Sequence, residues 1–262
     1  MHPLVNIGVK AAREGGKLMR RAYDEKPPLQ IETKSKHDYV TQVDRAVEDS
    51  ILRVIQKAYP HHSILSEECG EIKGDDTTWI IDPLDGTTNF VHGFPQFCVS
   101  IAVKERDRVE HGIIYDPIRD ELFTASRGQG AQLNARRMRI STTPTLDNAL
   151  LGTGFPFREV SIMDEYLAIL KSLFPLASGI RRAGAAALDL AYVAAGRLDG
   201  FWEYGLQDWD FAAAALMIHE AGGVVSTFDG SKDILGQRTL VAGNLKTHPL
   251  LLDVIQQATR LK

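Results

Sequence analysis

Residues 79–90 read WIIDPLDGTTNF, and this stretch places two acids and a proline directly after an apolar run. Asp82 and Asp85 are three residues apart, with Pro83 between them. Proline fixes one backbone dihedral angle, so it can aim both carboxylates the same way. Two carboxylates held close together repel each other unless a proton or a cation lies between them. The stretch can therefore hold a hard cation such as Mg²⁺, which takes carboxylate oxygens and keeps several waters.

The residues after the two acids add groups that suit an anion. Gly86, Thr87 and Thr88 can open a helix, whose free N–H groups and dipole favour a bound anion. A plain turn is the alternative, because Asp, Pro and Gly are turn residues and the pair Asp85-Gly86 is common in turns. A turn, however, requires neither a second acid nor two threonines. The spacing alone leaves both interpretations open.

Three further acidic positions can belong to the same site, and each also has an ordinary explanation. Glu67 and Glu68 follow a short apolar run. Asp210 stands near the start of a predicted helix, where an acid in the first turn is common. Asp44 follows Thr41 by three residues, which approximates a helix capping box. Spacing alone does not show that these acids meet in space.

The elements that must position these residues can be predicted from apolar periodicity. Apolar residues three or four apart predict helices at 4–23, 40–59, 162–174, 185–195, 210–221 and 248–261. Short apolar or alternating runs predict strands at 78–81, 198–204 and 223–228, and an antiparallel meander over 97–133. The polar stretch 141–148 predicts a boundary between an α+β part, 1–145, and an α/β part, 146–262. Strands and helices in both parts favour a layered α/β or α+β body.

Composition excludes several classes of protein. The chain has 262 residues, a net charge of −4 and a pI near 6.1, so no global basic field favours direct DNA binding. It has no signal-peptide core and no apolar run of about 18 residues, so we expect neither export nor a membrane span. Cys69 and Cys98 do not form a CxxC motif or a disulfide framework. We therefore expect a cytoplasmic protein.

Several motifs together resemble the inositol monophosphatase family over essentially the whole chain. They are Glu67-Glu68, the stretch 79–90, Trp209-Asp210-x-Ala212-Ala213 and Glu220-Ala221-Gly222-Gly223. The segment that begins at Arg181-Arg182-x-Gly184 and ends at Gly196 is most similar to the bacterial SuhB-type members. The resemblance implies the fold of that family, a layered αβαβα sandwich.

The resemblance also implies the roles of individual residues. One Mg²⁺ would be bound by Glu67, Asp82 and the backbone carbonyl of Leu84, a second by Asp82, Asp85 and Asp210, and a third, weaker one with help from Asp44. The implied catalytic residues are Thr87, Asp44 and Glu67, the first two lying beside an attacking water. The implied substrate-binding residues are Gly86, Thr87, Thr88, Gly184, Ala185, Ala186, Glu203 and Asp210. The 1–145 part would then carry most metal ligands, and the 146–262 part the substrate contacts and the last ligand.

The function implied by the resemblance is Mg²⁺-dependent hydrolysis of inositol monophosphate to inositol and phosphate. The implied enzyme is a homodimer, inhibited by lithium, with two or three Mg²⁺ in each site. Relatives with the same metal motif act on fructose bisphosphate or phosphoadenosine phosphate, which are the alternative substrates. SuhB-type proteins also imply a different role, as antitermination partners of Nus factors and RNA polymerase in ribosomal RNA synthesis.

Overall fold

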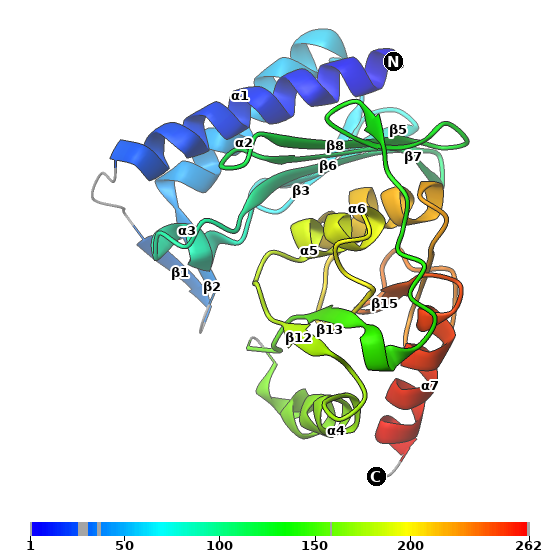
Figure 1. Ribbon diagram of the computed structural model, residues 1–262. Helices are drawn as coiled ribbons and strands as arrows, with labels where there is room; N and C mark the ends of the chain where they lie inside the picture. Colours follow the sequence, from blue (N-terminus) through cyan, green and yellow to red (C-terminus); the bar gives the residue numbers. More distant parts are fainter. Residues whose placement is uncertain (1, 26–30, 36–37, 158, 261–262) are drawn as a thin grey trace.

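The computed structural model describes residues 2–25, 31–35, 38–157 and 159–260 (Figure 1). Its helices are α1 (Pro3–Glu25), α2 (Gln42–Ala58), α3 (Thr87–Val91), α4 (Met163–Leu173), α5 (Ala186–Ala194), α6 (Asp208–Glu220) and α7 (Thr247–Arg260). Short 3-10 turns, η1 (Leu146–Asn148) and η2 (Val160–Ile162), add to these. None of the helices in the described part of the chain is long and apolar enough to cross a membrane.

The strands form two larger sheets and one hairpin. An eight-stranded sheet has the order β10-β9-β8-β7-β6-β5-β3-β4. Its strands are β3 (Ser63–Ser66), β4 (Gly70–Ile72), β5 (Thr77–Asp85), β6 (Cys98–Glu105), β7 (Arg108–Asp116), β8 (Glu121–Ser126), β9 (Gly130–Leu133) and β10 (Arg136–Arg137). A five-stranded sheet of order β12-β11-β13-β15-β14 consists of β11 (Leu150–Thr153), β12 (Gly179–Arg181), β13 (Gly200–Tyr204), β14 (Val224–Ser226) and β15 (Thr239–Gly243). The hairpin pairs β1 (Ile31–Ser35) with β2 (Asp38–Thr41).

Five layers result from how the helices cover these sheets (Figure 1). Helices α1 and α2 cover one face of the eight-stranded sheet, and α5 and α6 cover the other. The five-stranded sheet packs on the far side of α5 and α6, and α4 and α7 cover its outer face. Helix α6 is apolar on all sides over Phe211–Ile218, as expected for a helix packed between two sheets. The predicted layered αβαβα fold is confirmed.

The predicted helices are found, with ends that differ by a few residues. The strand predicted at 78–81 is longer than expected and continues through Asp82 and Pro83 to Asp85 as β5. Strands β11 and β15, which flank the central strand β13, were not predicted, because each is a short apolar run that contains glycine and has no alternation of its own. The boundary at residue 145 stays a prediction. Cys69 and Cys98 are free thiols.

A bulge in β5 explains the proline between the two aspartates. Along β5 the pairing with β6 runs from Asp82 opposite Ser100 to Asp85 opposite Cys98, so β5 contains one extra residue. In a regular strand, residues three apart point to opposite faces. The extra residue reverses that alternation and brings both carboxylates to the same side. Pro83 suits the bulge because it has no N–H to donate to the ladder.

Candidate active site

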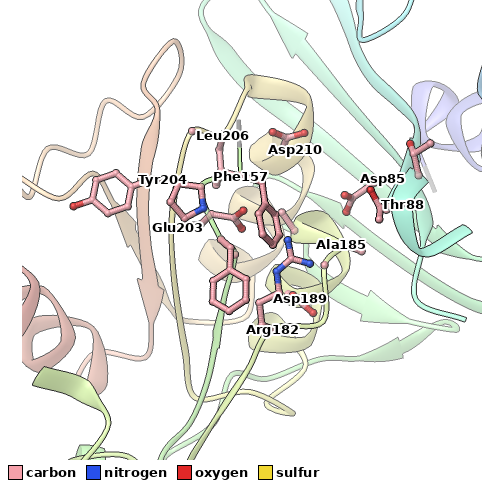
Figure 2. A pocket seen from close by; sticks show the side chains of 18 of the residues that line it. Asp85, Thr88, Phe157, Arg182, Ala185, Asp189, Glu203, Tyr204, Leu206 and Asp210 are labelled. Atoms are coloured by element: carbon pink, nitrogen blue, oxygen red, sulfur yellow. The ribbon is translucent and has the colours of Figure 1, made fainter. Parts of the chain in front are cut away.

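A cleft of about 410 Å³ opens between the end of β5, the loop before α5, the end of β13 and the start of α6 (Figure 2). It is lined by every site residue predicted from the sequence except one: Glu67, Asp82, Leu84, Asp85, Gly86, Thr87, Thr88, Gly184, Ala185, Ala186, Glu203 and Asp210. The exception is Asp44, which lies behind the wall of the cleft and contacts Thr87. Residues from both predicted parts of the chain therefore meet at one place.

Asp82 and Asp85 are buried and held by main-chain N–H groups. Leu84 N donates to Asp82 Oδ1 at 3.0 Å, and Ala187 N at the start of α5 donates to Asp85 Oδ2 at 2.8 Å. Asp82 is only 2% exposed. Burial raises its pKa well above the usual range, and the charges of Glu67, Asp85 and Asp210 raise it further. Burial also raises the pKa of Asp85 to about 6, against the lowering effect of its N–H donors.

Glu67 and Asp210 reach the same place from two other elements. Strand β3 runs parallel to β5, with Ser66 opposite Ile81, so Glu67 follows directly beside Asp82. Asp210 lies in the first turn of α6, where its Oδ2 accepts a hydrogen bond from Gln207 N at 2.7 Å and closes a capping box. Asp210 is therefore both an acid in the first turn of a helix, as its ordinary explanation predicts, and a residue that lines the cleft.

The acids approach one another without forming a closed cage. In the part of the chain that the structure describes, no group of three or more His, Cys, Asp or Glu side chains has the geometry of a metal site by itself. Mutual repulsion explains why uncompensated carboxylates stay apart. Their chemistry nevertheless suits Mg²⁺, which binds through a few carboxylates and keeps several waters instead of demanding an all-protein cage.

A hydrogen bond links Thr87 to Asp44 at the edge of the cleft. Thr87 Oγ1 lies 2.9 Å from Asp44 Oδ1 and 3.1 Å from the carbonyl oxygen of Leu84, and its single proton can serve only one of these acceptors at a time. Asp44 also closes the capping box of α2, because its Oδ2 accepts from Thr41 N and Thr41 Oγ1. Burial raises the pKa of Asp44, while its hydrogen bonds with Thr41 and Thr87 lower it. Asp44 is thus a buried acceptor directed at the threonine hydroxyl.

Gly86 is required where β5 turns into α3. Its φ of +95° lies in the left-handed region that favours glycine. A Cβ at this position would lie 2.8 Å from the carbonyl oxygen of Gln96 and 3.3 Å from Ala185 Cβ. The main chain at Gly86 therefore passes close to the loop before α5, and it narrows the cleft beside Thr87 and Thr88.

The other end of the cleft is built around Glu203. This carboxylate at the end of β13 is packed against Gly154, where a Cβ would lie 1.8 Å from Glu203 Oε1. Burial raises its pKa well above the usual range, as do the charges of Asp210 and Asp189, while Arg182 lowers it. Tyr166 and Thr153 lie behind it, with their hydroxyls 3.3 Å apart. This end of the cleft can accept hydrogen bonds from hydroxyl groups.

Asn89, Gln96 and Asp189 were not predicted as site residues. Asn89 Nδ2 lies within hydrogen-bond distance of the carbonyl oxygens of Gln96, Ala183 and Gly184, so it ties α3 to the loop before α5. Gln96 Nε2 donates to Asp189 Oδ1 at 3.3 Å. Burial raises the pKa of Asp189 to about 8, and Asp85 adds to the rise. Asn89 lies inside the motif at 79–90, but its role depends on partners far away in the sequence.

Comparison with known proteins agrees with this geometry. The model of the inositol monophosphatase family matches residues 1–260. Nus factor SuhB from Pseudomonas aeruginosa is 53% identical over 262 residues, covering 98% of this chain and 97% of the relative. The SuhB structure from Bartonella henselae has 45% identity and a TM-score of 0.95, with 98% and 99% of the two chains covered. An inositol monophosphatase from Anabaena has 36% identity and a TM-score of 0.87, with 97% and 95% covered. With this fold, this cleft and these relatives, the chain belongs to the inositol monophosphatase family of phosphatases.

Proposed function

We propose that this chain is a Mg²⁺-dependent phosphomonoesterase that hydrolyses inositol monophosphate or a similar sugar-alcohol phosphate. One observation carries the proposal: carboxylates from three separate elements border the same cleft as the hydrogen bond between Thr87 and Asp44. The likeness to an inositol monophosphatase supports the substrate class. Fructose bisphosphate and phosphoadenosine phosphate are the alternative substrates, as the resemblance implies.

The donor set supports Mg²⁺ as the cofactor. The acids are hard oxygen ligands, and a cation would relieve the repulsion that raises the pKa of Asp82. One ion would be held by Glu67, Asp82 and the Leu84 carbonyl, a second by Asp82, Asp85 and Asp210, and a third, weaker one with the help of Asp44. Bound Mg²⁺ would supply positive charge against the phosphate dianion and lower the pKa of a water molecule.

The residues beside the metals would move the proton. Asp44 accepts the Thr87 hydroxyl proton across 2.9 Å, so the Thr87 oxygen is free to accept a proton from the attacking water. The water would then attack phosphorus in line with the bond to the alcohol oxygen, without a phosphoenzyme. That bond breaks as the new P–O bond forms, and the alcohol oxygen leaves with the bonding electrons and takes a proton from solvent water. Asp85 is a poor candidate for the nucleophile because it would be occupied as a metal ligand, and its Oδ2 also accepts a hydrogen bond from Ala187 N. Glu67 completes the proposed catalytic set as a ligand of the first Mg²⁺.

The two ends of the cleft would hold the two halves of the substrate. Main-chain N–H groups of Gly86 and Thr87, with Thr88 beside them, would receive the phosphate. Glu203 and the main chain of Gly184–Ala186 would contact the sugar hydroxyls, beside Asp210. Glu203→Gln should therefore lower the hydrolysis of inositol 1-phosphate more than that of an aryl phosphate, because only the polyol loses a hydrogen-bond acceptor.

Phosphate release with a panel of phosphomonoesters tests the proposal. Turnover of inositol 1-phosphate with Mg²⁺, its loss in Asp85→Asn and its loss after chelation are the expected results. Full activity after exhaustive chelation would contradict the metal assignment. A single turnover of a chiral thiophosphate ester in ¹⁸O-water should invert the configuration at phosphorus. Retention, or a trapped phosphoprotein, would contradict direct attack by water.

A second function is favoured by the name of one relative. The Pseudomonas aeruginosa protein is a Nus factor, which supports a role for this chain as an antitermination partner of Nus factors and RNA polymerase. A deletion strain distinguishes the two functions. Full rescue by Asp85→Asn would favour the binding role, and failure of that variant to rescue would favour the phosphatase.

The resemblance also supports a homodimer and a cytoplasmic location. Light scattering of the purified chain tests the first inference, and cell fractionation tests the second. A monomer at micromolar concentration, or a membrane-bound fraction, would be the contrary results.

A further inference from the structure

Arg182 lines the cleft, and its guanidinium lies against two aromatic rings (Figure 2). Its Cζ lies 5.2 Å from the centre of the Phe155 ring and 5.0 Å from that of Phe157. Within the described residues, the guanidinium has no hydrogen-bond acceptor and no carboxylate within 4.0 Å. Ring faces fix a guanidinium without using its N–H groups, so these donors stay available to a ligand.

Packing against the Gly184 loop fixes the guanidinium further. A Cβ on Gly184 would lie 2.5 Å from Arg182 Nη1, so a side chain there would displace the guanidinium. Gly184 has a φ of +88°, which favours glycine independently of this contact. The guanidinium therefore lies against the main-chain segment that borders the polyol end of the cleft.

The charge of Arg182 acts on groups at the polyol end of the cleft. It lowers the pKa of Glu203, Asp189 and Tyr166, and it is not among the main influences on Asp82 or Asp85. Burial raises the pKa of both Glu203 and Asp189, which weakens them as counterions. A cation with free donors thus faces the part of the cleft where the alcohol portion of a substrate would lie.

We propose that Arg182 binds a second anionic group, a carboxylate or a phosphate, on the alcohol portion of the substrate. A planar guanidinium with unused N–H groups matches two oxygens of such an anion at once. The substrate class would then be sugar-alcohol phosphates that carry another negative charge, in preference to neutral polyol monophosphates. This inference rests on the proposed phosphomonoesterase function.

Two matched pairs of substrates test the proposal, one with the second anionic group close to the reacting phosphate and one with it farther away. Glycerol 2-phosphate and 2-phosphoglycerate differ by one carboxylate, and inositol 1-phosphate and inositol 1,4-bisphosphate differ by one distant phosphate. In at least one pair, the wild type should favour the more anionic member by about tenfold in kcat/KM, which corresponds to one charge-assisted contact. Arg182→Gln should remove that preference through KM, with kcat and the other member changed by less than about twofold.

Further variants separate binding from simple packing. Arg182→Lys keeps the charge but loses the planar fork, so it should keep only part of the preference. Phe155→Leu removes one ring face and should raise KM for the anionic member alone. Arg53→Gln is the control, because Arg53 is an exposed arginine on α2 that donates to Asp49 O and does not line the cleft. All four proteins should unfold at similar temperatures.

The outcomes distinguish this inference from the function on which it rests. Turnover without preference in either pair would overturn the role of Arg182 and leave the phosphatase intact. Equal losses on both members in Arg182→Gln would assign the arginine to the reacting phosphate or to packing, and would also overturn it. No turnover of any of the four esters by the wild type would defeat the proposed function, and the inference with it.

Discussion

Asp44 and Asp210 each satisfy the start of a helix and also take part in the cleft. Asp44 accepts two hydrogen bonds from Thr41 and one from Thr87, and Asp210 accepts one from Gln207. A capping acid is held by main-chain donors in one orientation, so its second oxygen is aimed before any ligand arrives. At the residue scale, the same hydrogen bonds therefore stabilise the helices and orient the chemical groups.

Removal of the Thr87 hydroxyl tests the proposed proton path. Thr87→Ala should lower kcat by about 10²–10⁴-fold, the usual contribution of positioned proton transfer, with KM little changed. Thr87→Ser keeps the hydroxyl and should retain most of kcat. Steady-state kinetics and calorimetric titration with Mg²⁺ are the measurements. Unchanged turnover in Thr87→Ala would mean that another group accepts the proton of the attacking water.

Asp189 predicts a pH-dependent stability in the metal-free protein. Its pKa is about 8 in the folded chain, against about 4 when unfolded, so the folded state keeps a proton that the unfolded state releases. Stability therefore falls as pH rises from about 4 to about 8 and then levels off. Asp189→Asn keeps an acceptor for Gln96 and should be more stable at pH 8 by roughly 2–4 kcal/mol. Urea unfolding in EDTA should show this gain shrinking towards pH 5, whereas an equal gain at both pH values would contradict the titration.

At the scale of elements, the cleft depends on how closely α6 packs on the eight-stranded sheet. A Cβ on Gly112 of β7 would lie 2.7 Å from the carbonyl oxygen of Ala213 and 3.1 Å from its Cα, so it would meet the main chain of α6. Main chain inside a helix cannot swing aside as a side chain can. The position of Asp210 at the start of α6 therefore depends on a glycine in a strand that does not line the cleft.

Gly112→Ala should disturb the site from a distance. Overpacking should destabilise the fold by about 1–3 kcal/mol. A displaced Asp210 should lower kcat/KM by about 10- to 100-fold, because small misplacements of catalytic groups have large effects. Gly8→Ala is the matched control, since its Cβ would meet side chains and not main chain, with the movable Cδ1 of Ile113 nearest at 2.7 Å and a ring atom of Trp79 at 3.4 Å, and alanine favours the α1 helix. The measurements are denaturant unfolding and steady-state kinetics on both variants. Full activity in Gly112→Ala would contradict the dependence of Asp210 on the packing at Gly112.

At the scale of the whole molecule, the cleft joins groups from both sheets and from the helices between them. A ligand that binds there links elements that meet only in the folded chain, so it stabilises the folded state by mass action. Glu67 directly follows β3 and Asp82 lies in the neighbouring strand β5 of one sheet, Glu203 lies in a strand of the other, and Asp210 lies in α6 between them.

Addition of Mg²⁺ should therefore raise the unfolding temperature. At 100 times its dissociation constant, an ion contributes about 2.7 kcal/mol, which is several degrees for a chain of this size. Asp85→Asn should lose most of this shift. Ca²⁺ should compete without supporting turnover, because it tolerates irregular geometry while Mg²⁺ requires a tight octahedron. Li⁺ should inhibit, as the family resemblance implies. Thermal scans and phosphate release measure these effects, and an identical Mg²⁺ shift in Asp85→Asn would place the ion elsewhere.

The sequence by itself determined the types of ligand and the local elements. Two acids around a proline, followed by glycine and two threonines, define the chemistry of the stretch at 79–90 without any structure. Helices α2 and α7 follow from apolar periodicity because burial of one helix face is a local pattern. The resemblance added the ligand set and the family, and the family is confirmed.

Only the tertiary structure decided which distant groups meet. The bulge that brings Asp82 and Asp85 to one face depends on the pairing with β6. The hydrogen bonds from Asn89 to the Gly184 loop and the contacts of Arg182 with the Phe155 and Phe157 rings join segments far apart in the sequence. Periodicity encodes which face of an element is buried, but not which element covers it, because strand pairing and side-chain contacts form between distant parts of the chain. The acids could therefore be predicted as candidates from the sequence, whereas only the tertiary structure showed that they meet in one cleft.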